Sequence, residues 1–180
     1  MMKPITAIEV VTRGAGVLSA LLILPLIAAL VIEVFSRYLL DSPTLWAFEI
    51  SYMVMGAIFM LAIANALRLG QHVTVDVVSL RLSRRTNAAI QCFCYLMFLP
   101  LSGWLSWELV LYFHEALETG ERSGRSAWNP LMWPVYSVWA VGFLILTLQL
   151  LAELIKAFYT LLGMEDRLHN SSEQGAEHHG

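Results

Sequence analysis

Apolar positions in this chain gather into four long runs that are separated by shorter polar stretches. The clearest run carries no charge from Ile50 to Leu67, with Trp46 before it and Arg68 after it. A helix of about 20 apolar residues crosses the ~30 Å hydrocarbon core of a bilayer, so this run is close to the length needed. Aromatic side chains favour the headgroup level and a cation there can reach water, so Trp46 and Arg68 mark its two ends.

The same pattern predicts an all-α integral membrane protein with four transmembrane helices. The first run is uncharged from Gly14 to Ile32. It is longer than the roughly 7–15 apolar residues of a cleaved signal peptide, so we expect it to stay in the protein as the first transmembrane helix. Pro25 and Pro100 lie inside runs and are expected to kink their helices, which neighbouring helices tolerate in a membrane. The predicted spans form a single transmembrane domain of residues 1–163 and cover about residues 14–36, 47–67, 86–110 and 130–153.

Polar stretches precede, separate and follow the spans. Residues 1–13 form a short polar lead-in, and Asp41–Pro43 is a turn signal between the first two spans. Residues 73–85 mix apolar and polar positions, and we expect them to lie along the membrane interface, where the membrane context favours a helix over a strand. Residues 164–180 are polar and lack aromatic side chains, so a disordered tail is predicted.

Four spans place both termini on the same side of the membrane, and the basic residues predict which side. Loops on the cytoplasmic side carry an excess of lysine and arginine. If the termini are cytoplasmic, eight basic residues lie inside and three outside. The eight are Lys3, Arg13, Arg68, Arg81, Arg84, Arg85, Lys156 and Arg167, and the three are Arg37, Arg122 and Arg125. Both termini are therefore predicted to be cytoplasmic.

Composition supports a membrane protein and argues against several functions. The chain is 58% hydrophobic and 14% charged, whereas soluble domains carry about 25% charged residues. A net charge of -3 without a basic stripe gives no support for nucleic-acid binding. Cys92 and Cys94 point to different faces of a helix and form neither a redox pair nor a zinc motif. The sequence shows no nucleotide-binding loop, catalytic triad or metal cluster, so we expect neither an enzyme nor a bound cofactor.

Three charged residues near the ends of the first two spans are candidates for function. Glu33 and Arg37 are one helical turn apart and can meet directly, while Glu49 opens the next helix and can share Arg37. One interpretation is a proton or cation site. The other is an ion-pair cluster that stabilises the first hairpin, formed by the first two spans and the turn between them. We favour this second interpretation because a coupling carboxylate is expected nearer the bilayer centre.

Other polar residues in or beside the spans have structural interpretations. His72 lies at the cytoplasmic end of the second span and His114 follows the third span at its outer end, so most of a membrane thickness separates them and they cannot ligate one haem iron. Glu108 is expected to snorkel or pair, and Asn65 and Gln149 to hydrogen-bond a neighbouring helix. Small residues four apart permit close helix approach, at Gly16/Ala20, Ala62/Ala66 and Ser102/Ser106.

Several short motifs follow one another along the chain. They are Arg37-Tyr38, then Trp46-x-x-Glu49, then Arg68-x-Gly70-x-His72-Val73-x-Val75-Asp76. In this order they resemble the small four-helix membrane subunit (DctQ type) of tripartite ATP-independent periplasmic (TRAP) transporters. The resemblance covers about residues 10–160. The fourth span is similar but less specific, at Pro130, Trp133, Pro134, Tyr136 and Gly142.

The resemblance implies a subunit of the bacterial inner membrane that pairs with a large permease subunit and works with a periplasmic substrate-binding protein. In that family the large subunit carries the substrate and sodium sites, and the small subunit is a static scaffold beside it. Uptake is driven by an ion gradient, usually of sodium, and substrates are typically organic acids. The candidate structural and interface residues are Glu33, Arg37, Tyr38, Trp46, Glu49, Arg68, Gly70, His72 and Asp76.

Three alternatives stay open at this point. A small homodimeric multidrug exporter would couple protons through a glutamate in mid-span, whereas Glu33 lies about 28 Å along the first helix at 1.5 Å per residue. A quinone-linked redox protein would need haem ligands at one depth or a C-x-x-C pair, and the sequence shows neither. A four-span structural protein without a transport role can be tested only by identifying the partner.

Overall fold

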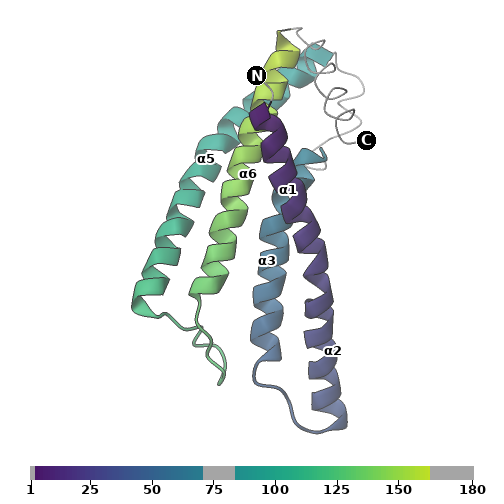
Figure 1. Cartoon of the computed structure of the whole chain (residues 1–180), viewed down its shortest axis with the longest axis vertical. Coiled ribbons are helices and arrows are strands. Elements are labelled where there is room, and N and C mark those ends of the chain that lie inside the picture. The colour runs from purple at the N-terminus through teal and green to yellow at the C-terminus, as the bar shows by residue number, and fades with distance from the viewer. Residues whose placement is uncertain (1–2, 71–83, 163–180) are drawn as a thin grey trace.

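The computed structural model describes residues 3–70 and 84–162. Over these residues the chain is helical, apart from loops and one isolated bridge between Arg122 and Leu131. Four helical segments in this part of the chain are long and apolar enough to cross a membrane, which confirms the predicted all-α membrane architecture. The helices in Figure 1 are α1 (Lys3–Leu21), α2 (Ile23–Leu39), α3 (Ala47–Arg68), α5 (Arg84–Thr119) and α6 (Trp133–Leu161).

The first membrane-crossing segment consists of two helices, α1 and α2, which together cover Pro4–Leu39. The helix is interrupted at Leu22, three residues before Pro25. Pro25 has no N–H to give to the carbonyl of Leu21, and its ring crowds that carbonyl. The irregularity expected from the proline is therefore present, within the turn that precedes it.

The helices extend past the predicted spans at several ends. α1 begins at Lys3, α5 continues to Thr119 and α6 continues to Leu161. The 36 residues of α5 are about 54 Å long at 1.5 Å per residue, and this helix runs unbroken through Pro100. It is therefore longer than the ~30 Å that crossing the hydrocarbon core requires. Residues 71–83 and 163–180, which include most of the predicted interfacial segment and the predicted tail, lie outside the described residues.

α6 occupies the middle of the bundle, since it packs against α5 on one side and against α3 and α1 on the other. α3 packs in turn against α1 and α2, whereas α5 packs essentially only against α6 (Figure 1). The start of α1 and the end of α6 lie at the same end of the bundle. Its cytoplasmic location stays a prediction from the charge distribution.

Small residues bring α6 and α1 very close to α3. A Cβ atom at Gly142 would lie 2.6 Å from the carbonyl oxygen of Met60, so the two backbones nearly touch there. At Gly16 of α1 the near neighbour is a side chain, since a Cβ there would lie 2.5 Å from Nδ2 of Asn65 in α3. Such approaches are typical of helix packing in membranes. The contact between α3 and α6 continues into a buried cluster of Ala64, Leu67, Leu146 and Leu150.

Candidate functional site: polar clusters at the two ends of the bundle

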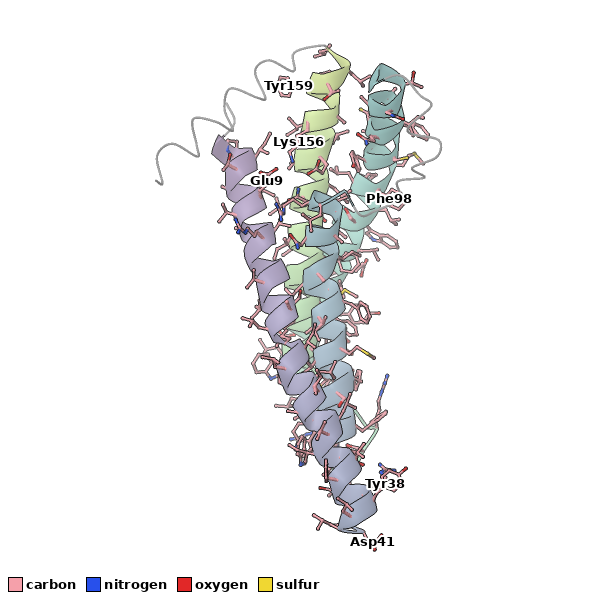
Figure 2. All side chains as sticks on the ribbon, turned by 90° about the vertical axis from the view of Figure 1, so that its right-hand side faces the viewer. Glu9, Tyr38, Asp41, Phe98, Lys156 and Tyr159 are labelled. Carbon is pink, nitrogen blue, oxygen red and sulfur yellow. The ribbon has the colours of Figure 1, made fainter. Side chains whose placement is uncertain are left out.

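Glu33, near the end of α2, ties the first helical hairpin together. One carboxylate oxygen accepts a hydrogen bond from Arg37 Nε at 2.9 Å and another from its Nη2, the pairing that the spacing of four residues predicts. The other oxygen accepts from the backbone N–H of Thr44 at 3.0 Å and from its hydroxyl. Because Thr44 lies in the loop before α3, the carboxylate joins α2 to that loop. Tyr38 and Asp41 mark this end of the bundle in Figure 2.

Glu49 lies in the first turn of α3 and is fully buried. Its Oε1 accepts a 2.5 Å hydrogen bond from the hydroxyl of Ser123, which lies in the loop between α5 and α6. The first turn of a helix also favours a negative charge through the helix dipole. In the described part of the chain, the second oxygen is buried without a hydrogen-bond partner. We call α5, this loop and α6 the second hairpin. Glu49 therefore bonds to the second hairpin and does not share Arg37, which was the alternative considered from the sequence.

The loop that carries Ser123 is closed by hydrogen bonds between its two sides. The N–H of Ser123 donates to the carbonyl of Pro130 at 3.0 Å, across the loop. Asn129 has a left-handed φ of 47°, and its side-chain oxygen accepts from the N–H of Gly124 at 2.8 Å. Asparagine tolerates this backbone conformation better than most residues. The loop thus holds the Ser123 hydroxyl in place by its own hydrogen bonds.

Aromatic side chains fasten the same loop to two helices. The guanidinium of Arg125 lies over the ring of Tyr52 in α3, 4.9 Å from the ring centroid, which is a cation–π contact. The Tyr52 hydroxyl lies 3.5 Å from the sulfur of Met132, just before α6. Tyr136 of α6 donates a hydrogen bond to Glu121 at 3.2 Å. The start of α3, the loop and the start of α6 form one connected cluster.

The other described residues of the predicted motifs lie at separate positions and do not form one cluster. Trp46 is the N-cap residue of α3, without a side-chain hydrogen bond to the helix, and Tyr38 is 75% exposed. At the other end of α3, Arg68 Nε donates to the side-chain oxygen of Asn65 at 3.1 Å. Gly70 has a φ of 67°, which glycine adopts without steric cost. The two remaining motif residues, His72 and Asp76, lie outside the described residues.

A second polar cluster lies at the opposite end of the bundle, between α1 and α6 (Figure 2). The ammonium of Lys156 is 2.5 Å from the carboxylate of Glu9 and 2.8 Å from that of Glu153. Gln149 donates to Glu153 at 2.7 Å and accepts from the hydroxyl of Thr12 at 2.9 Å. Thr12 and Gln149 are fully buried, so their hydrogen bond satisfies both side chains inside the bundle. A continuous series of polar contacts joins α1 to α6.

The sequence predicts only one part of this second cluster, the bond from Gln149 to a neighbouring helix. A further signal is present, since Gln149, Glu153 and Lys156 recur at intervals of four and three and therefore share one helix face. The partner face was missed because residues 1–13 appeared to be a polar lead-in. In the structure that segment is helical from Lys3 and packs against α6.

Hydroxyl groups join α5 to α6 between the two clusters. Thr147 lies 3.0 Å from the hydroxyl of Ser106 and donates to that of Ser102 at 3.2 Å. The predicted small pair on α5 thus faces a hydrogen-bonding residue of the neighbouring helix. On the same helix, Glu108 accepts a hydrogen bond from the indole N–H of Trp104 at 3.1 Å.

Comparison with protein families matches residues 26–160, more than half of the chain, to the DctQ component of tripartite ATP-independent periplasmic transporters. The chain belongs to this family. A search of curated proteins found no match. DctQ is a transporter component and not an enzyme family, and in TRAP systems it functions with a large permease and a substrate-binding protein. The four apolar helices agree with a multi-pass inner-membrane DctQ component.

The DctQ match includes Glu33, Glu49 and Lys156 but begins after α1. Consequently Glu9 and Thr12, the α1 half of the second cluster, lie outside the matched residues. In this DctQ component, the contact between α1 and α6 therefore joins a helix that precedes the matched residues, α1, to a helix that lies almost wholly within them, α6.

Proposed function

We propose that this DctQ component is a static scaffold that stabilises and orients the large permease subunit of a TRAP uptake transporter. The observation that carries this proposal is the use of its charged groups, buried or partly buried, to join helices. Glu33 joins α2 to the following loop, Glu49 joins α3 to the second hairpin, and Lys156 joins α6 to α1. Groups committed to such contacts hold a bundle together and are poorly placed to bind and release a substrate.

The transport step itself is assigned to the partners under this proposal. The large subunit would carry the substrate and the coupling ion, with a sodium gradient driving uptake of an organic acid. Substrate would reach it from the periplasmic binding protein. The small subunit would lie with both termini in the cytoplasm, as the basic residues predict.

Purification of the complex tests the scaffold role. The chain is isolated in detergent from its native membrane, and the proteins that remain bound are identified by mass spectrometry. We expect a large polytopic permease at about one-to-one stoichiometry. Recovery of only further copies of this chain would contradict the proposal and favour the homodimeric exporter.

Reconstitution separates assembly from transport. The purified complex is placed in liposomes with the binding protein, and sodium-driven uptake of organic acids is measured per assembled complex. We expect Glu33→Gln and Glu49→Gln to lower the yield of complex while uptake per complex stays as in the wild type. Normal assembly with altered ion dependence or substrate preference would place coupling in this chain and overturn the scaffold role.

A further inference from the structure

The helix α5 has one side packed on α6 and another side that no helix of the described chain covers. The packed side carries Ser102 and Ser106, which meet Thr147 of α6. At 3.6 residues per turn, Trp104 and Trp107 lie on the other side. They are 59% and 63% exposed, and both belong to the segment Thr86–Thr119 of α5, which is long and apolar enough to cross a membrane. We call the uncovered residues considered below the α5 surface: Leu96, Pro100, Gly103, Trp104, Trp107 and Glu108.

Two backbone features of the α5 surface find no partner among the residues that the structure describes. Pro100 has no N–H, so the carbonyl of Leu96 lacks its regular donor in the helix. An unsatisfied carbonyl is costly in hydrocarbon, and prolines in membrane helices are tolerated where a neighbour supplies the missing partner. One turn further, a Cβ atom at Gly103 would meet nothing within 4 Å. A glycine disfavours the helix by comparison with alanine, and here that cost has no compensating contact inside the described chain.

Three other glycines of the membrane helices show what such a residue does when its partner is present. Gly16, Gly56 and Gly142 each have an atom of a neighbouring helix within 3.0 Å of the position that a Cβ would take. In each case the missing side chain makes room for a close helix contact. Gly14 of α1 is open as well, so an open glycine alone does not indicate a helix contact. At Gly103 the open space lies one turn from the carbonyl that Pro100 leaves without its regular donor, and the two together favour a contact with a helix outside the described chain.

Glu108 adds a charge to the α5 surface. Its carboxylate accepts a hydrogen bond from Trp104, but an indole N–H does not neutralise it. Among the residues that the structure describes, no lysine or arginine forms an ion pair with Glu108. Carboxylates within membrane segments are usually paired. The α5 surface therefore combines a backbone acceptor, space at a glycine and an acidic group.

We infer that the α5 surface receives a transmembrane helix of the large permease subunit. That helix presents a small or hydroxyl-bearing residue to Pro100 and Gly103 and an arginine or lysine to Glu108. This inference rests on the proposed function and adds which face of the chain the permease contacts. Lipid tails offer neither a donor for the carbonyl of Leu96 nor a cation. A second copy in a symmetric contact would oppose Glu108 to Glu108, which is repulsive.

A pair of glycine variants tests the inference. Gly103→Leu fills the space on the α5 surface, and Gly14→Leu is the matched control, because a Cβ at Gly14 of α1 also meets nothing within 4 Å. Both are co-expressed with the permease and purified through this chain. We expect Gly103→Leu to reduce the recovered permease by about tenfold or more, since overpacking a contact commonly costs enough for that change, and Gly14→Leu to leave it unchanged. Equal recovery from both variants would overturn the inference.

The charge is tested by Glu108→Gln, which keeps an acceptor for Trp104 and removes the negative charge. We expect a severalfold loss of permease recovery that is smaller at high salt, because an ion pair is screened. Size-exclusion profiles of each variant without the permease report whether the chain itself stays folded. Unchanged recovery at low salt would contradict an ion pair at Glu108.

Photo-crosslinking identifies the occupant without depending on a destabilising change. A benzophenone amino acid replaces Trp107, and in a separate control it replaces Leu24 of α2, which is 66% exposed. We expect Trp107 to label the permease more strongly than Leu24 does. Labelling of lipid alone or of a second copy at Trp107 would overturn the inference. If the wild-type chain recovers no permease at all, the proposed function fails first, and the two failures are thereby distinguished.

Discussion

The hydroxyl of Ser123 donates a 2.5 Å hydrogen bond to the buried carboxylate of Glu49, across 74 positions of sequence. This contact connects the loop of the second hairpin to the first turn of α3. A hydrogen bond to a charged group stabilises by about 1.5–3 kcal/mol, and losing it leaves the charge buried without its partner. The two halves of the bundle therefore depend on this pair at one of their ends.

Removing the donor tests that dependence. We expect Ser123→Ala to destabilise the folded chain by about 1–3 kcal/mol, because the Glu49 carboxylate stays buried without its hydrogen bond. Thermal unfolding in detergent measures the loss. Ser42→Ala, at an exposed hydroxyl in the other loop, is the control and should be nearly neutral. Similar melting temperatures for both variants would show that the bond contributes little.

The cluster between α1 and α6 makes a second prediction. Replacing Lys156 by methionine leaves Glu9 and Glu153 near one another without their shared cation. Because these side chains are partly exposed, we expect a loss of only about 1 kcal/mol. A double-mutant cycle with Glu9→Gln should show that the two changes are not additive. Strict additivity would mean that the observed contact carries no interaction energy.

The first hairpin should loosen when Glu33 is altered. We expect Glu33→Ala to increase hydrogen exchange of the loop amides around Thr44, because the carboxylate accepts from both the N–H and the hydroxyl of that residue. Asp41→Asn is the control, since its side chain is exposed and asparagine accepts the same φ of 47°. The idea is wrong if the loop exchanges equally fast in the wild type and in Glu33→Ala.

Two alanine variants distinguish packed from open glycines. We expect Gly142→Ala to destabilise by about 1–3 kcal/mol, because the new Cβ would lie 2.6 Å from the carbonyl oxygen of Met60. Gly103→Ala should be neutral or slightly stabilising in the isolated chain, since alanine favours a helix and meets nothing there. Thermal unfolding of both variants without the permease makes the comparison. Equal losses at the two positions would contradict the helix contact at Gly142.

The features that follow from local periodicity could be predicted from the sequence. Apolar runs indicated the four membrane helices, Pro25 indicated the interruption in the first, and the four-residue spacing indicated the pairing of Glu33 with Arg37. Partners that lie far apart in the chain could not be predicted in this way. Arg37 was the nearest cation to Glu49 in sequence, whereas Ser123 reaches Glu49 only because a closed loop brings it back to α3.

The polar appearance of the N-terminal segment concealed its role for a related reason. Hydropathy identifies residues that avoid water, and Glu9 and Thr12 reduce that signal in α1. Whether such residues are solvated or bonded to another helix depends on the partner surface. Here the partner is the polar face of α6, with Gln149 and Lys156. A single helix pattern contains no information about which other helix lies beside it.

The near-contact of the α3 and α6 backbones at Gly142 and Met60 has a mechanical consequence. Sliding one helix along the other by a single residue would bring a side chain to the place where only a glycine fits, so their register is locked. A force applied to α6 is then transmitted to α3, and the two helices move together as one rigid body. Any displacement of helices during a transport cycle would then occur between this pair and its neighbours, and not between α3 and α6.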